Sequence, residues 1–220
     1  MRRIAVLCII GVLASASIAV AEDYNPPTTW SRTDPGATYQ IWEFSTEYEP
    51  AMSYPDILPE DSSNPGNPVV NMTGGFMENT VWQAEYPQGS GHFGIWGFEE
   101  DMIASIPNFN EDNPIKEVWV QMTYLADEAP ILWLLPEGSI PDGGYMSLVD
   151  QTAPDAAGFV NATWYGTMEP NPTMEEIWIR PAECTLYVDE LVIDTICRVP
   201  EPTTIGLLGF GLLGLLRKRK

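Results

Sequence analysis

Short segments in which apolar and polar residues alternate are the feature that most limits the fold of this chain. They are separated by Pro, Gly, Asn and Asp, and the 220 residues include 20 prolines. Because proline lacks the N–H that an internal helical turn requires, prolines at this density exclude long helices. A period of two is typical of strands with one buried face. The sequence therefore predicts an all-β body.

Ten strands are predicted, each bounded by residues that favour turns. They cover 39–44, 69–73, 80–86, 92–98, 115–125, 131–134, 145–151, 159–168, 174–179 and 185–196. Chain reversals are predicted at 110–114 and 141–144, and a long loop without regular structure at 50–68. No repeat of fixed length is present, so the pattern favours an antiparallel β-sandwich over a solenoid or a propeller.

The alternation also predicts which side chains face the core. Within 115–125 and 174–179, one set of alternate residues is apolar and should point inward: Val118, Val120, Met122, Ile177 and Ile179. The other set places a tryptophan among polar neighbours on the outer face of each strand. Its members are Glu117, Trp119 and Gln121 in the first strand and Glu176 and Trp178 in the second.

The first 21 residues have the form of a signal peptide. Arg2 and Arg3 precede an apolar run at 4–13, and small residues end in Ala21. The run is too short to span a bilayer and lacks the basic flank of a membrane anchor, which is the alternative interpretation. We predict cleavage by signal peptidase after Ala21.

The last 22 residues contain three successive signals. Pro200, Glu201 and Pro202 are followed by an apolar run at 205–216 and by four basic residues at 217–220. All three parts resemble the PEP-CTERM sorting signal. As a helix the apolar run would be about 18 Å long, against about 30 Å of hydrocarbon, and four glycines weaken it further. We therefore predict a short transmembrane sorting helix that anchors the chain only transiently; a lasting tail anchor is the alternative.

The resemblance implies processing by an exosortase near the motif Pro200, Glu201 and Pro202. It also implies export to the cell surface or the extracellular matrix of a bacterium with two membranes and an exopolysaccharide-rich surface. The predicted organisation is a signal peptide at 1–21, a β-sandwich domain at 22–198 and a sorting signal at 199–220.

The predicted domain is strongly acidic. Residues 22–198 contain 30 Asp and Glu against four Lys and Arg, a formal net charge of −26. Such a charge excludes nucleic acid as a partner and disfavours anionic polysaccharide that no divalent cation bridges. Acidic side chains keep an exported protein soluble, which explains most of this composition. An alternative for some of them is a structural Ca²⁺ site, for which Glu43 and Asp189 are the candidates.

Two short segments carry a second resemblance. Residues 186–194, with the sequence LYVDELVID, resemble the closing strand of galactose-binding-like jelly rolls. Together with YQIWEF at 39–44, they resemble exported PEP-CTERM proteins built on that sandwich. The resemblance implies a jelly-roll topology for the β-sandwich.

Cys184 and Cys197 are the two cysteines of the predicted domain, and export permits a disulfide between them. If 185–196 is one continuous strand, the two Cα atoms are about 43 Å apart, whereas a disulfide needs about 7 Å or less. The bond would thus require a hairpin near Glu190 and Leu191, which are poor turn residues. Two unpaired thiols in an exported protein are also unusual, so both outcomes stay open.

Residues for catalysis are few. His92 is the only histidine of the chain. The sequence contains no Gly-x-Ser-x-Gly motif, which would carry the nucleophile of a serine hydrolase. One histidine and two distant cysteines do not suit zinc. We therefore predict that the protein is not an enzyme. A glycan hydrolase remains a less favoured alternative, because a pair of carboxylates is defined by its separation in space.

The two outward tryptophans are the best candidates for ligand binding. Trp119 and Trp178 can stack on sugar rings, while Glu117, Gln121 and Glu176 bond hydroxyl groups. The alternative is that loops cover these aromatic side chains as a second small core. The leading hypothesis is a non-catalytic surface or matrix protein that binds carbohydrate. A purely structural surface component without a ligand site is the second hypothesis.

Overall fold

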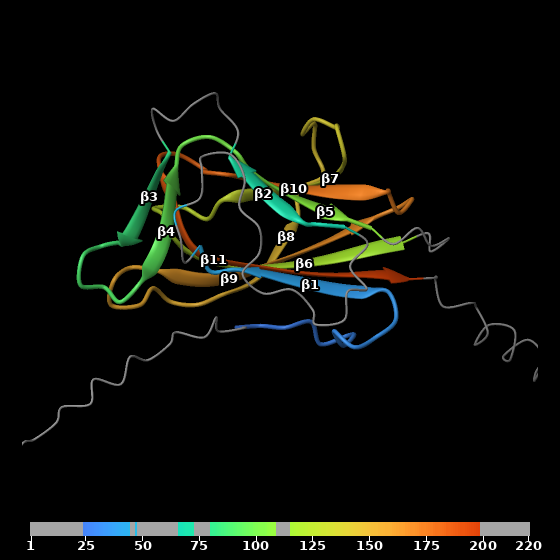
Figure 1. Ribbon diagram of the computed structural model, residues 1–220, viewed down its shortest axis with the longest axis horizontal. Coiled ribbons are helices and arrows are strands. Elements are labelled where there is room, and N and C mark those ends of the chain that lie inside the picture. The colour runs from blue at the N-terminus through green and yellow to red at the C-terminus, as the bar shows by residue number, and fades with distance from the viewer. Residues whose placement is uncertain (1–23, 45–46, 48–65, 73–79, 109–114, 199–220) are drawn as a thin grey trace, which may run out of the picture.

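The protein is a two-layered β-structure. The computed structural model describes residues 24–44, 47, 66–72, 80–108 and 115–198, and all regular structure in these ranges is β-strand. Two antiparallel sheets lie face to face around one core, as expected for a β-sandwich (Figure 1). The all-β prediction is confirmed.

The predicted signal peptide at 1–21 and sorting helix within 199–220 lie outside the described residues. Within the described ranges, no helix has the length and hydropathy needed to cross a membrane.

The larger sheet is built around its longest strand. In spatial order it contains β3 (Val81–Glu85), β4 (Phe93–Phe98), β11 (Leu186–Arg198), β6 (Ile115–Leu125), β9 (Val160–Met168) and β8 (Ser147–Gln151), and β1 (Ala37–Trp42) also pairs with β11. One edge of β11 is shared, because β4 pairs with its first residues and β1 with its second half. The other edge pairs with β6 over almost its whole length. This sheet is called the seven-stranded sheet below.

The smaller sheet has four strands. Its order is β2 (Val69–Met72), β5 (Met102–Pro107), β10 (Met174–Arg180) and β7 (Ile131–Pro136). All pairings in it are antiparallel. Figure 1 shows this four-stranded sheet as a separate layer over β1, β6, β9 and β11.

The core between the sheets contains the residues that the alternation places there. Val118, Val120 and Met122 of the seven-stranded sheet meet Ile177 and Ile179 of the four-stranded sheet in one buried cluster. Each of these side chains is at most 2% exposed. The residues that alternate with these in β6 and β10 therefore lie on the outer faces of the two sheets, as predicted.

β5 is the strand that the period-two pattern does not show. Met102, Ala104 and Ile106 face the core, as expected for alternate residues. Ile103 lies on the opposite face and is also nearly buried, at 9% exposure. Because both faces of this segment are covered, its sequence is apolar throughout most of its length and has no polar alternation to detect.

Cys184 and Cys197 are not joined by a disulfide; Cys184 is exposed and Cys197 is buried. β11 runs without a turn from residue 186 to residue 198, and its irregularity between Val188 and Glu190 is a register shift of the β-bulge type. The hairpin that the disulfide requires is therefore not formed. An extended strand keeps the two thiols at opposite ends of the domain.

The predicted reversal at 141–144 is confirmed, because Tyr145 returns to form an antiparallel bridge with Trp133 of β7. The predicted reversal at 110–114, and the predicted loop at 50–68 except for its last three residues, lie outside the described residues.

Candidate functional site

The five residues predicted to bind a ligand do not come together. Glu117, Trp119 and Gln121 lie on β6, on the outer face of the seven-stranded sheet, whereas Glu176 and Trp178 lie on β10, on the outer face of the four-stranded sheet. Because the core separates the two sheets, these outer faces point in opposite directions. Each face must be considered by itself.

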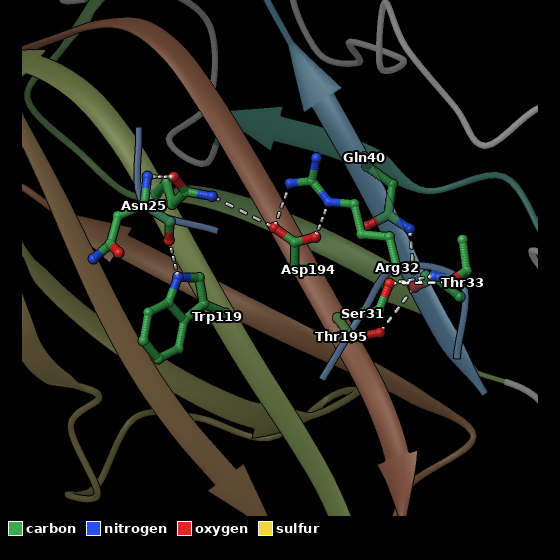
Figure 2. Close-up of polar contacts among 10 residues, drawn as sticks. Asn25, Ser31, Arg32, Thr33, Gln40, Trp119, Asp194 and Thr195 are labelled. Carbon is green, nitrogen blue, oxygen red and sulfur yellow. Dashed lines mark hydrogen bonds and ion pairs between the residues drawn. The ribbon is translucent and has the colours of Figure 1, made fainter. Parts of the chain in front are cut away.

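An N-terminal segment covers the outer face of the seven-stranded sheet. We call residues 24–36 the strap. The indole N–H of Trp119 donates to the carbonyl oxygen of Asn25 at 2.6 Å, and the N–H of Asn25 donates to Oε1 of Gln121 at 2.5 Å (Figure 2). Asn25 also bonds the hydroxyl of Thr163 on β9 through Nδ2, at 3.3 Å. The strap thus occupies the polar groups that were predicted to meet a ligand.

The strap ends in a tight turn that feeds directly into β1. The N–H of Ser31 donates to the side chain of Asp34 at 2.9 Å, and the N–H of Ala37 donates to the Asp34 carbonyl at 3.0 Å. Gly36 has φ of 79°, a region that favours glycine, and a Cβ there would lie 3.1 Å from the carbonyl oxygen of Cys197. The local sequence therefore holds the end of the strap close against β11.

An ion pair and a small apolar cluster fasten the strap further. The guanidinium of Arg32 makes a two-pronged contact with the carboxylate of Asp194, which is fully buried in β11 (Figure 2). Trp30 of the strap packs with Ile196 and Trp119. Of the two alternatives for Trp119, ligand binding and cover by a loop, the structure favours cover by a loop.

Glu117, the third candidate on this face, also has a partner within the chain. Its Oε1 lies 3.3 Å from Nε of Arg198 at the end of β11. The outer face of the seven-stranded sheet thus uses its predicted binding residues for internal contacts. We place the candidate functional site on the other sheet.

The outer face of the four-stranded sheet presents a group of aromatic side chains. Trp178 of β10 is the cross-strand neighbour of Trp133 on β7, and Tyr145 packs on Trp133 with ring centroids 5.3 Å apart. Tyr145 is 65% exposed, whereas Trp133 is buried beneath its neighbours. We call Trp133, Tyr145, Trp178 and the adjacent Glu176 and Arg180 the aromatic face.

Polar groups flank these rings. The indole N–H of Trp178 donates to Glu176 Oε2 at 3.0 Å. Arg180 lies with its guanidinium 5.0 Å from the centre of the Trp133 ring and bonds both carboxylate oxygens of Asp101 at 2.6 Å. The aromatic face thus combines a flat apolar surface with hydrogen-bonding groups whose positions are fixed by neighbouring side chains. Sites of this kind recognise amphipathic ligands.

His92 lies in a third cluster, between two carboxylates. Its Nδ1 is 2.5 Å from Oδ2 of Asp189, its Nε2 is 2.7 Å from Oδ2 of Asp155, and its ring stacks on Phe159 at 3.9 Å. Burial is the largest influence on the pKa of His92 and lowers it, but the bonds to the two carboxylates outweigh burial and raise the pKa above its ordinary value. The arrangement favours a protonated imidazole that clamps two acidic side chains.

The carboxylates of this cluster differ in their own pKa. Burial raises the pKa of Asp189, with His92 acting against it and the negative charges of Asp155 and Glu43 adding to it. Asp155 is also affected most by burial, but hydrogen bonds from His92 and from two backbone N–H groups bring its pKa below the ordinary value. Asp155 is therefore the more readily ionised of the two.

This cluster does not suit the predicted Ca²⁺ site at Glu43 and Asp189. Ca²⁺ takes six to eight oxygen ligands, whereas the nearest partner of the Asp189 carboxylate is the imidazole of His92, whose protonated form repels a cation. Across the described ranges, no three His, Cys, Asp or Glu side chains are grouped so that they could hold a metal ion.

Sequence reasoning missed Trp133, Tyr145 and Arg180 as members of the candidate site. Arg180 ends a strand whose outward alternation already includes Glu176 and Trp178, so its position was available from the pattern. Trp133 and Tyr145 join the face only through the pairing of β7 with β10 and through the reversal before Tyr145. Sequence spacing alone does not show these pairings.

Comparison with known proteins identifies the C-terminal end. Residues 198–220 match the PEP-CTERM protein-sorting motif. No curated protein and no solved structure matches the chain, and the resemblance to galactose-binding-like jelly rolls is not confirmed. The sorting motif supports the prediction made from Pro200, Glu201 and Pro202. The chain is an exported protein that an exosortase sorts to the cell surface.

Proposed function

We propose that this exosortase-sorted protein is a non-catalytic component of the cell surface or extracellular matrix that binds carbohydrate through its aromatic face. The observation that supports this most directly is the position of Tyr145 and Trp178 beside Glu176 and Arg180, on an outer face of the sandwich. The proposed site retains two of the predicted ligand residues, Trp178 and Glu176. It has Trp133, Tyr145 and Arg180 in place of the other three.

The chemistry of the aromatic face matches that of a sugar ring. A pyranose has an apolar C–H face that stacks on an aromatic ring and equatorial hydroxyls that need donors and acceptors at its rim. Glu176 supplies an acceptor and Arg180 supplies donors, and both are already held in place by Trp178 and Asp101. Side chains fixed before binding lose less conformational entropy when the ligand arrives.

The charge of the protein narrows the ligand class. With a formal net charge of −26 over residues 22–198, the surface repels anionic polymers. Neutral glycans are therefore the proposed ligands. An anionic exopolysaccharide would bind only in the presence of a bridging divalent cation.

The proposal of a non-catalytic role is supported by the state of the only histidine. Both ring nitrogens of His92 lie within hydrogen-bond distance of a carboxylate, so neither is oriented to take a proton from a nucleophile. A glycan hydrolase would instead reveal itself by shortened products after incubation with the glycan that binds. Such products would contradict this part of the proposal.

Glycan binding by two matched tryptophan variants tests the proposal. Trp119 and Trp178 are both partly exposed on an outer face, but only Trp178 belongs to the aromatic face. On an array of neutral glycans, Trp178→Ala is expected to weaken binding about tenfold or more, as loss of an aromatic anchor does. Trp119→Ala is expected to bind like the wild type.

Three outcomes would overturn carbohydrate binding by this face. The wild type binds no glycan on the array with or without Ca²⁺, Trp178→Ala binds as tightly as the wild type, or Trp119→Ala is the variant that loses binding. Near-UV circular dichroism of each variant confirms that the fold is retained. The first outcome would favour the alternative of a purely structural surface component.

A further inference from the structure

A lysine and a glutamate lie completely buried between the two sheets, at one end of the sandwich. Lys116 is near the start of β6 in the seven-stranded sheet, and Glu175 is near the start of β10 in the four-stranded sheet. Both are 0% exposed, and Asn108, directly after β5, is 7% exposed beside them. Moving two charges out of water costs several kcal/mol per ion, so a buried pair of this kind needs a specific reason.

The amine and the amide are arranged as reactants would be. Lys116 Nζ lies 3.1 Å from Oε1 of Glu175 and is in contact with Oδ1 of Asn108. The carbonyl carbon Cγ of Asn108 is one bond away from that oxygen, so the amine is adjacent to it. Reacting atoms held at contact distance in a fixed orientation gain the large rate advantage of an intramolecular reaction.

The nitrogen of the Asn108 amide is held on the other side, away from the lysine. Its Nδ2 donates to Oδ1 of Asn171 at 3.1 Å and to the carbonyl oxygen of Pro172 at 2.8 Å. These two acceptors fix the plane of the amide and direct its oxygen, not its NH₂ group, toward Lys116. The NH₂ group is thus positioned as a leaving group.

The environment favours the protonated form of the Glu175 carboxyl. Burial raises the pKa of the Glu175 carboxyl, although Lys116 and the side chain of Asn108 act in the opposite direction. Transfer of a proton from the ammonium to this carboxylate removes both buried charges. It leaves Lys116 with a nucleophilic lone pair and Glu175 with a proton to donate.

We propose that Lys116 and Asn108 form an intramolecular isopeptide bond, with Glu175 as the acid and base of the reaction. Nζ of Lys116 attacks Cγ of Asn108 while Glu175 donates its proton to the amide oxygen. Glu175 then takes a proton from the attacking nitrogen and passes it to the NH₂ group. The C–Nδ2 bond breaks, the amide nitrogen leaves as ammonia, and the proton on the amide oxygen returns to Glu175 as the carbonyl re-forms. One amine and one primary amide yield one secondary amide and one ammonia, so no oxidant or energy source is needed.

The bond would be a covalent link between the two layers. Asn108 and Lys116 are eight residues apart in the sequence. Asn108 directly follows β5 of the four-stranded sheet, whereas Lys116 lies at the start of β6 in the seven-stranded sheet. No disulfide joins the cysteines in the described part of the chain. An isopeptide bond would limit the freedom of the unfolded chain, as a disulfide does, and would resist reduction outside the cell.

Trypsin is a sharp probe of this bond because residues 22–198 contain only four basic residues. Pro181 follows Arg180, and trypsin does not cleave before proline, so Lys116 is the one cleavable site between Arg32 and Arg198. Acylation of Nζ removes the positive charge that trypsin recognises. The cross-linked protein should therefore yield one fragment covering 33–198.

The exported wild-type protein, denatured and reduced, is expected to weigh about 17 Da less than the sequence between its termini, the mass of one ammonia. Fragmentation should place this loss on a branch between Asn108 and Lys116. Glu175→Gln is expected to have its full sequence mass and to be cut after Lys116. Glu128→Gln, the same change at an exposed position, should keep the loss.

Wild-type protein with its full sequence mass and normal cleavage after Lys116 would overturn the proposal. A loss of ammonia mapped to another site would do the same, as would a gain in mass that joins Lys116 to Cys197, whose Sγ lies 3.6 Å from Nζ. A fully cross-linked Glu175→Gln would overturn the role of Glu175. The wild type alone decides whether the bond exists, so the test does not depend on the folding of a variant.

Discussion

At the scale of single residues, His92 joins three parts of the chain. It directly precedes β4, Asp155 lies in the connection from β8 to β9, and Asp189 lies in β11. A protonated imidazole bonded to two carboxylates is a charge-assisted contact, and such hydrogen bonds are stronger than neutral ones. The contribution of this cluster to stability should therefore depend on pH.

The sign of that dependence follows from the raised pKa of His92. The stabilisation is complete below the ordinary histidine pKa of about 6.5 and is lost as the pH rises through the higher pKa of the folded state. His92→Gln should lower the free energy of unfolding by about 2 kcal/mol near pH 6. The difference from the wild type should shrink at pH 9, as measured by urea unfolding.

The same cluster can be observed directly, because the protein has one histidine. Proton NMR of untagged protein gives a single imidazole titration, whose midpoint is expected above 6.5. Asp155→Asn, which removes one of the two partners, should lower that midpoint. A wild-type midpoint at or below 6.5 would show that burial, not the carboxylates, determines the charge of His92.

At the scale of elements, the strap and the aromatic face offer two chemically similar ion pairs. Arg32 bonds Asp194 and lies 4.5 Å from the centre of the Tyr39 ring; Arg180 bonds Asp101 and lies 5.0 Å from the centre of a tryptophan ring. The pairs differ in burial. The carboxylates of Asp194 and Asp101 are 0% and 11% exposed, and the side chains of Arg32 and Arg180 are 23% and 46% exposed.

This difference predicts unequal costs for the same substitution. Arg32→Met leaves a buried carboxylate without its cation and should lower the free energy of unfolding by about 2 to 4 kcal/mol. Arg180→Met should cost less than Arg32→Met, because Asp101 keeps some contact with water at 11% exposure, whereas Asp194 has none. Chemical denaturation of both variants measures the two costs. Equal costs would mean that the strap contributes little to the stability of the sandwich.

Most strands could be predicted because their two faces differ. β6 and β10 have one apolar face and one polar face, so their period of two marks both their presence and their orientation. β5 is covered on both sides, and this signal is absent from it. The sequence also contained no sign that the strap covers the outer face of the seven-stranded sheet, because the strap lies about 90 positions before β6 in the chain.

At the scale of the whole molecule, the sandwich and the sorting signal adjoin. β11 ends at Arg198, and the matched sorting motif begins at the same residue. β11 pairs with three strands and is largely buried, so the domain needs it complete. Processing near Pro200, Glu201 and Pro202 would leave the whole strand in the mature protein.

The sorting prediction is tested on the exported protein. Wild-type material at the cell surface is expected to end before the apolar run at 205–216, and a triple substitution of Pro200, Glu201 and Pro202 by alanine should keep the complete tail. Mass spectrometry of C-terminal peptides distinguishes the two forms. Glu128→Gln, far from the motif, should be processed as the wild type is. Surface protein that still ends in Lys220 would contradict the prediction.

The sequence alone determined the all-β class, the inward faces of β6 and β10 and the destination of the chain, because strand geometry and the sorting motif are local properties. Lys116 and Glu175 share the alternation of the inward residues of their strands, but no buried charge was predicted at these positions. Only the tertiary structure decided which outer tryptophan the strap contacts, why the cysteines stay apart, and that Asn108 meets Lys116 and Glu175. These outcomes depend on which distant segments pack together, and no local pattern contains that information.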